Sequence, residues 1–112
     1  MSADIPLLEA VADRLRHDGP LEIGTMFRRP GIRTAGTIVA FLGTDDELIA
    51  KLPVERVQQL FAAGDALPVT MGTRTMREWV TIAAADSRAA TIERWAPLVQ
   101  EALDFVTAQR AG

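Results

Sequence analysis

Residues 24–64 read GTMFRRPGIRTAGTIVAFLGTDDELIAKLPVERVQQLFAAG, and this stretch decides the fold. The run TIVAFL at 37–42 has the β-branched and aromatic content of a central strand. Before it, Pro30 and Gly31 predict a turn, because proline and glycine supply the backbone angles of tight turns. Gly36 separates a further short strand from TIVAFL. The first half of the stretch therefore predicts successive antiparallel strands joined by short connections.

The second half ends the β-meander and begins a helix. Residues 43–46 read GTDD and predict a turn into another strand at 47–52. Pro53 suits the first turn of a helix, Gly64 suits its end, and the apolar residues between them recur at helical spacing. The meander is thus predicted to lead directly into an amphipathic helix.

The flanking residues extend this pattern on both sides. Apolar residues at helical spacing predict a helix over 6–18. The spacing then changes to a period of two, which predicts a strand over 21–27. Further along, strands are predicted at 69–71 and 78–82, on either side of a loop at 72–75.

A terminal helix is predicted after Asp86 or Ser87, either of which can cap it. Pro97 lies inside its apolar pattern, and a proline within a helix removes a hydrogen bond and kinks the axis. We therefore expect the helix to begin near residues 91–92. The alternative is a longer helix that bends at 95–96.

Together these elements predict an α+β fold of two layers. We expect an antiparallel sheet of about five to six strands with helices packed on one face, in the order α-β-β-β(-β)-α-β-β-α. No repeat, low-complexity tract or linker interrupts the chain, so residues 1–112 are predicted to form one domain.

The composition narrows the classes of function. The chain has 112 residues, a formal net charge of −3 and no cysteine. The charge disfavours a nucleic-acid partner, and the lack of cysteine excludes disulfides, thiolate catalysis and Cys-ligated zinc. The sequence shows neither a secretory signal nor an apolar run near the roughly 20 residues that span a bilayer. We expect a cytoplasmic protein that does not bind membranes.

Several short motifs follow one another in a definite order. They are Met26-Phe27, Gly31-Ile32, Ala40-Phe41-Leu42, Asp46-Glu47-Leu48-Ile49-Ala50-Lys51-Leu52, Leu60-Phe61-Ala62-Ala63-Gly64, Pro68, Met76, Trp79-Val80 and Glu101-Ala102. Across residues 8–106 this order resembles the TfoX N-terminal domain family, found at the front of the TfoX/Sxy competence regulators and alone in short bacterial proteins. The strand at 79–82 is also similar to one in the related MmcQ/YjbR proteins, which have a comparable α+β fold. The resemblance implies a small domain without established catalytic residues.

The chain departs from the family pattern at Arg28 and Arg29. Members of the family commonly have a Met-Phe-Gly-Gly run, and the two arginines stand where the glycines would be, so a conformation open only to glycine is unused or otherwise supported. The TfoX regulators also carry a further C-terminal domain, so a role in competence is not carried over to this chain.

Arginines provide the candidate binding site. Arg28, Arg29 and Arg33 surround the predicted first turn, and Arg77 lies near a later loop with Arg74. Guanidinium groups grouped on loops can bind a carboxylate, a phosphate or an acidic partner through forked hydrogen bonds. The alternative interpretation is that they are edge-strand charges that discourage aggregation.

Catalytic candidates are few. His17 is the only histidine, and the simplest interpretation places it at a helix end, near Asp13, where the helix dipole favours it. Residues 45–47 read DDE but lack the spacing of a calcium loop. We expect no enzyme activity, no metal site and no cofactor.

Trp79 and Trp95 lie in apolar-periodic segments, where core packing and an interface role are both open. With a fold signature and no catalytic set, the sequence predicts a non-enzymatic protein-interaction or regulatory module. Its partner would be another protein or a second copy, so a homodimer is one expectation. The alternative function is binding of a small anionic ligand or a nucleic-acid phosphate at the Arg-rich hairpin.

Overall fold

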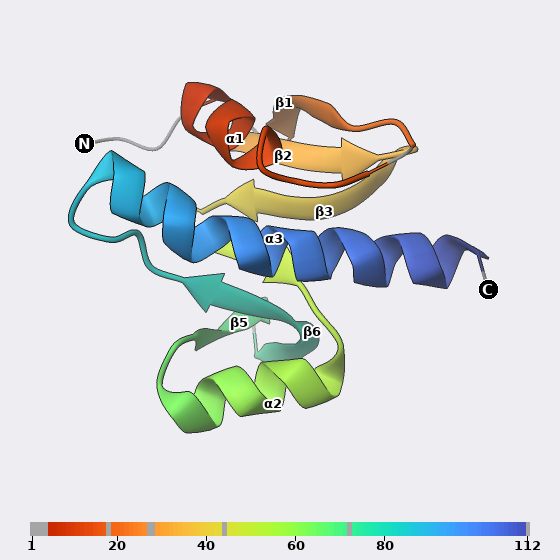
Figure 1. Cartoon of the computed structure of the whole chain (residues 1–112). Coiled ribbons are helices and arrows are strands. Elements are labelled where there is room, and N and C mark those ends of the chain that lie inside the picture. The colour runs from red at the N-terminus through yellow and green to blue at the C-terminus, as the bar shows by residue number, and fades with distance from the viewer. Residues whose placement is uncertain (1–4, 18, 27–28, 44, 72, 112) are drawn as a thin grey trace.

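A computed structural model describes residues 5–17, 19–26, 29–43, 45–71 and 73–111 (Figure 1). Its elements are α1 (Ile5–Ala12), β1 (Glu22–Met26), β2 (Arg29–Thr34), β3 (Thr37–Leu42), β4 (Leu48–Lys51), α2 (Val54–Ala63), β5 (Leu67–Met71), β6 (Arg74–Ile82) and α3 (Arg88–Ala111). The strands form one six-stranded sheet in the order β1-β2-β3-β4-β6-β5, and every neighbouring pair is antiparallel. The predicted α+β fold and element order are confirmed.

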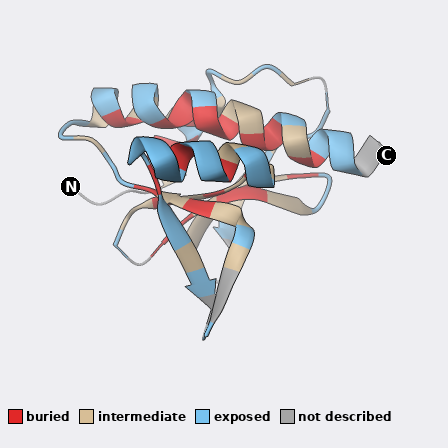
Figure 2. Ribbon diagram, turned by 90° about the horizontal axis from the view of Figure 1, so that it is seen from below, coloured by how far each residue is buried: buried red, intermediate tan, exposed pale blue. Residues whose placement is uncertain are grey.

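The three helices form one layer and the sheet forms the other (Figure 2). The α3 helix packs against β3 and β4, α1 lies beside α3 and contacts β1 and β2, and α2 packs against β6. The core between the layers is apolar; its fully buried residues include Ile32, Leu42, Leu48, Val80 and Trp95. The β5–β6 hairpin extends away from the helices, on the other side of the sheet (Figure 2).

The α2 helix has the ends that the sequence predicts. Pro53 precedes it, and Gly64 follows it in the left-handed conformation, with φ of 78°. The Gly64 N–H donates to the Phe61 carbonyl oxygen, and the N–H of Asp65 donates to that of Leu60. These bonds satisfy carbonyl groups that a helix end otherwise leaves unpaired.

The predicted turn at Pro30 and Gly31 is wrong, because both residues lie inside β2. The fixed φ of proline is compatible with an extended strand, and the missing N–H is tolerated where no ladder bond is needed. Pairing of β2 with β3 begins only at Gly31, opposite Phe41. The connection between β1 and β2 falls instead on residues 27–28, which lie outside the described residues.

The expected late start of the last helix is also wrong, because α3 begins at Arg88 and contains Pro97. Ser87 caps it: its Oγ accepts a hydrogen bond from the Ala90 N–H at 3.1 Å. Trp95 and Val99, on either side of the proline, are fully buried. Tertiary packing of this face outweighs the local cost of a proline in a helix, about 3 kcal/mol. Among the described residues, no helix has both the length and the apolar content needed to cross a membrane.

Other predicted bounds change as well. The first helix ends at Ala12 rather than near residue 18, because the backbone of Arg16 bonds to the side chain of Gln100 on α3. The Gln100 Oε1 accepts from the Arg16 N–H, and its Nε2 donates to the Arg16 carbonyl oxygen. The last strand is longer than predicted, since β6 begins at Arg74 rather than Glu78.

Candidate functional site

The helices of the described residues all lie on one face of the sheet and leave the other face uncovered; we call this second face the open face (Figure 2). Leu48 and Ala50 of β4 are buried under the helices, so Ile49 between them points to the open face. Phe41 pairs with Ile49 across β3 and β4 and therefore shares that face. Trp79 joins them, because it pairs with the residue two positions after Ile49.

These side chains form a partly exposed apolar cluster. The rings of Phe41 and Trp79 meet edge to face, with centroids 5.8 Å apart and an interplanar angle of 62°. The Lys51 Nζ lies 6.0 Å from the centroid of the Trp79 ring, a cation–π geometry. Ile38 lies on the same face, because it pairs with Arg33, the residue after the buried Ile32 on β2. We call Ile38, Phe41, Ile49 and Trp79 the open-face patch.

Acidic and basic side chains balance around the open-face patch. Glu22 of β1 lies directly opposite Arg33 of β2, and Arg33 in turn pairs with Ile38. Glu47 comes two residues before Ile49, and Lys51 comes two residues after it. Among its described residues, a face with this balance of charge has no excess of cations to attract a polyanion.

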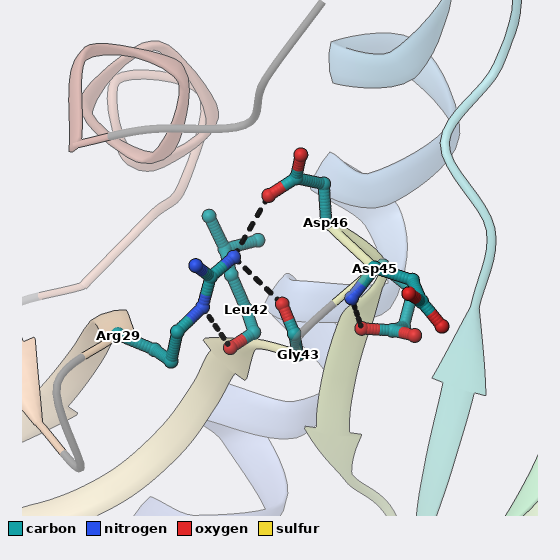
Figure 3. A network of polar contacts seen from close by, with 6 residues as sticks. Arg29, Leu42, Gly43, Asp45 and Asp46 are labelled. Atoms are coloured by element: carbon teal, nitrogen blue, oxygen red, sulfur yellow. Dashed lines mark hydrogen bonds and ion pairs between the residues drawn. The ribbon is translucent and has the colours of Figure 1, made fainter.

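Arg29 connects β2 to the turn between β3 and β4 (Figure 3). Its Nη2 donates to Asp46 Oδ1 at 2.8 Å and to the Gly43 carbonyl oxygen at 2.7 Å, and its Nε lies 3.4 Å from the Leu42 carbonyl oxygen. Asp46 has a positive φ of 60°, which aspartate tolerates better than most residues. The Arg29 guanidinium is therefore used within the fold, where it fastens the β3–β4 turn.

The described candidate arginines, Arg29, Arg33 and Arg77, do not meet at one site. Arg28 lies outside the described residues. Arg33 is four residues after Arg29 on β2, about 13 Å along an extended strand. Arg77 is on β6, with β3 and β4 between it and β2, and lines a groove with Phe61 of α2. The edge-charge interpretation is wrong for Arg33, because β2 is paired there with both β1 and β3.

His17 lies beyond the end of α1, so the predicted helix-end role is wrong. The Thr34 hydroxyl donates its single proton to the Pro20 carbonyl oxygen at 2.8 Å, so it must accept the 3.1 Å bond from His17 Nε2. A nucleophilic hydroxyl would instead give its proton to the imidazole. The bond holds the loop after α1 against β2.

Asp104 lines the same groove as His17, and its Oδ1 accepts a hydrogen bond from Gln100 Nε2 at 3.0 Å. The groove thus contains one imidazole and one carboxylate. The imidazole already bonds to Thr34, and the carboxylate already bonds to Gln100. Within the described ranges, no group of three His, Asp or Glu side chains is placed to hold a metal ion. The acidic run at 45–47 serves its own turn, where the Asp45 N–H donates to Glu47 Oε1.

Polar contacts between helices are structural as well. Arg56 of α2 forms a two-pronged pair with Glu101 of α3, at 2.7 Å and 3.2 Å. The hydrogen bond that Arg56 donates to Glu101 raises the pKa of Arg56, so the guanidinium stays protonated. Trp95 is fully buried and its indole N–H donates to the Ala83 carbonyl oxygen at 3.2 Å, which settles its place in the core.

No family model, curated protein or solved structure matches the chain. The candidate site therefore depends on the geometry of the open face. Its central residues, Phe41 and Ile49, were not among the candidates drawn from the sequence. The signal that could have indicated them is the alternation of each strand, in which they lie between buried neighbours.

Proposed function

We propose that this chain is a non-enzymatic binding module that recognises another protein molecule through the open face of its sheet. The observation that carries the proposal is the open-face patch, in which aromatic and aliphatic side chains lie on the side away from all three helices. Burying such side chains against a partner gains about 25 cal/mol per Å² of apolar surface removed from water.

A protein partner suits this face better than a nucleic acid or a small anion. Its charges are balanced, and the Arg29 guanidinium is already bonded to Asp46. Leu67, which is 67% exposed, extends the apolar surface to the edge strand β5, because it pairs with Thr81 next to Ile49. An apolar centre with a balanced charged rim is typical of protein interfaces.

Three further parts of the proposal rest on the sequence. The ordered motifs support a stand-alone domain similar to the TfoX N-terminal family, with a regulatory role. The composition supports a cytoplasmic location. The lack of a nucleophile–base arrangement supports a function without catalysis.

The proposal is tested by affinity capture from the native host with two matched variants. Ile49→Glu places a charge at the centre of the open-face patch, whereas Val54→Glu places one on α2, where Val54 is 37% exposed. We expect the bound proteins to be retained by the wild type and by Val54→Glu but lost from Ile49→Glu. Equal recovery by both variants would contradict the role of the open face.

A further inference from the structure

We infer that the open face packs against the same face of a second copy of this chain, about a two-fold axis that passes through Ile49. The inference rests on the proposed function of the open face and names its partner. It follows from the order of charges along β4 and from the direction of the β5–β6 hairpin.

The residues along β4 present a charge pattern that is complementary to itself. A Cβ placed on Gly43 would lie against both the Glu47 carboxylate and the Ile49 Cδ1, so these two side chains lean over Gly43 on the open face. Lys51 continues the same side of the strand, over the Trp79 ring. On the open face, this segment therefore presents an acidic, an apolar and a basic side chain in that order along the strand.

A two-fold axis that is perpendicular to β4 and parallel to the sheet makes use of this symmetry. Glu47 and Lys51 each lie two residues from Ile49, about 6.6 Å along the strand in opposite directions. Rotation by 180° about Ile49 therefore brings Glu47 of each copy opposite Lys51 of the other. Such an interface contains each contact twice, as expected for a homodimer. An axis along β4 through Ile49 would instead set Glu47 opposite Glu47 and Lys51 opposite Lys51, so that like charges would meet.

The β5–β6 hairpin fits the same axis. Trp79 pairs with Lys51 at the end of β4, and β6 begins five residues earlier, at Arg74, so the hairpin extends past the Lys51 end of the sheet. It projects on the open-face side (Figure 2). Under the proposed axis the two hairpins lie at opposite ends of the paired sheets.

The size of the face sets the expected affinity. Six strands about 4.8 Å apart and about 20 Å long present roughly 500 Å² of flat surface. A standard interface takes about 800 Å² from each partner, so this dimer belongs at the weaker end. We expect a dissociation constant in the range of about 1–100 μM.

Sedimentation equilibrium from about 0.5 to about 500 μM chain, which brackets that range, measures the self-association. The wild type and Val54→Glu are expected to approach the mass of a dimer. Ile49→Glu places two carboxylates at the axis and should weaken the association at least about 30-fold, the scale of an interface hot spot. Urea unfolding of each variant verifies that it is folded.

Charge exchange tests the axis itself. Glu47→Lys and Lys51→Glu alone each set like charges against one another across the interface, and each should weaken the homodimer about 10-fold. An equimolar mixture of the two variants pairs opposite charges again and should dimerise at least as well as the wild type. The protein with both substitutions should also dimerise. Misfolding of one variant cannot produce this recovery.

A wild type that stays monomeric to about 500 μM overturns the inference, and so does a dimer that Ile49→Glu leaves intact. Recovery in the mixture but not in the double variant overturns the axis through Ile49. A monomer whose captured partners are lost on Ile49→Glu leaves the proposed function standing without the homodimer. Capture that is insensitive to Ile49→Glu removes the proposed function instead.

Discussion

Replacing Arg29 with alanine should destabilise the fold, and this separates its structural role from the binding role that the sequence predicts. The side chain joins β2 to the β3–β4 turn through Asp46 and through the carbonyl oxygens of Gly43 and Leu42. Alanine removes all of these contacts and leaves the Gly43 carbonyl, which lies in a buried residue, with only the 3.2 Å hydrogen bond from the Asp46 N–H.

The magnitude follows from the exposure and length of each contact. The side chains of Arg29 and Asp46 are 32% and 33% exposed, so solvent screens the ion pair and limits it to about 0.5–1 kcal/mol. The 2.7 Å bond to Gly43 has a charged donor and contributes about 1.5 kcal/mol. The 3.4 Å contact with Leu42 is too long to add much. The expected loss is about 2 kcal/mol, or about 8 °C in melting temperature for a chain of this size.

Urea unfolding followed by tryptophan fluorescence measures the loss. Arg33→Ala is the matched control, because it removes the same side chain from the same strand far from the β3–β4 turn. Asp46→Asn keeps a side chain that tolerates the positive φ, and its cycle with Arg29→Ala should give a coupling of about 0.5–1 kcal/mol. Arg29→Ala as stable as the wild type within about 0.3 kcal/mol would refute the reasoning and return Arg29 to the binding candidates.

Three substitutions test other local features by changes in unfolding free energy. Ala35→Asn should gain about 0.5–1 kcal/mol, because Ala35 has φ of 48° in a two-residue hairpin turn that favours asparagine; a lower urea midpoint would contradict this. Gly64→Ala should cost about 1 kcal/mol through its φ of 78° alone, since nothing lies within 4 Å of an added Cβ; an unchanged melting temperature would count against it. Thr91→Val should cost about 2 kcal/mol, because the buried hydroxyl donates to the Ser87 carbonyl and accepts from the Ala85 N–H. An unchanged unfolding free energy of Thr91→Val in calorimetry would overturn this role of the Thr91 hydroxyl.

The elements that the sequence predicts well are those with local causes. Pro53 and Gly64 bound α2 through backbone angles that each residue carries with it. The errors fall where a distant contact decides. Arg16 leaves the first helix because Gln100, 84 residues later, bonds to its backbone, and Pro97 stays helical because α3 packs against the sheet on both sides of it.

The candidate site shows the same division at the level of single side chains. Sequence spacing indicated that Arg29 and Arg33 are close along the chain. The partner of Arg29 is instead Asp46, which follows β3 in the sequence. An arginine is long enough to reach several neighbours, so its role depends on which strand lies beside its own. Spacing along one strand contains no information about that neighbour.

The two tryptophans show what the structure adds about function. Both occur in apolar-periodic segments, and periodicity alone gives each strand two faces without saying which one the helices cover. Trp95 lies on the helix that covers the sheet and is fully buried, whereas Trp79 lies on the face that the helices leave open. Trp79 contacts Phe41 and Lys51 there and remains partly exposed. The difference arises from the helices all packing on one side, and for that reason a binding surface can lie among residues that the sequence alone would assign to the core.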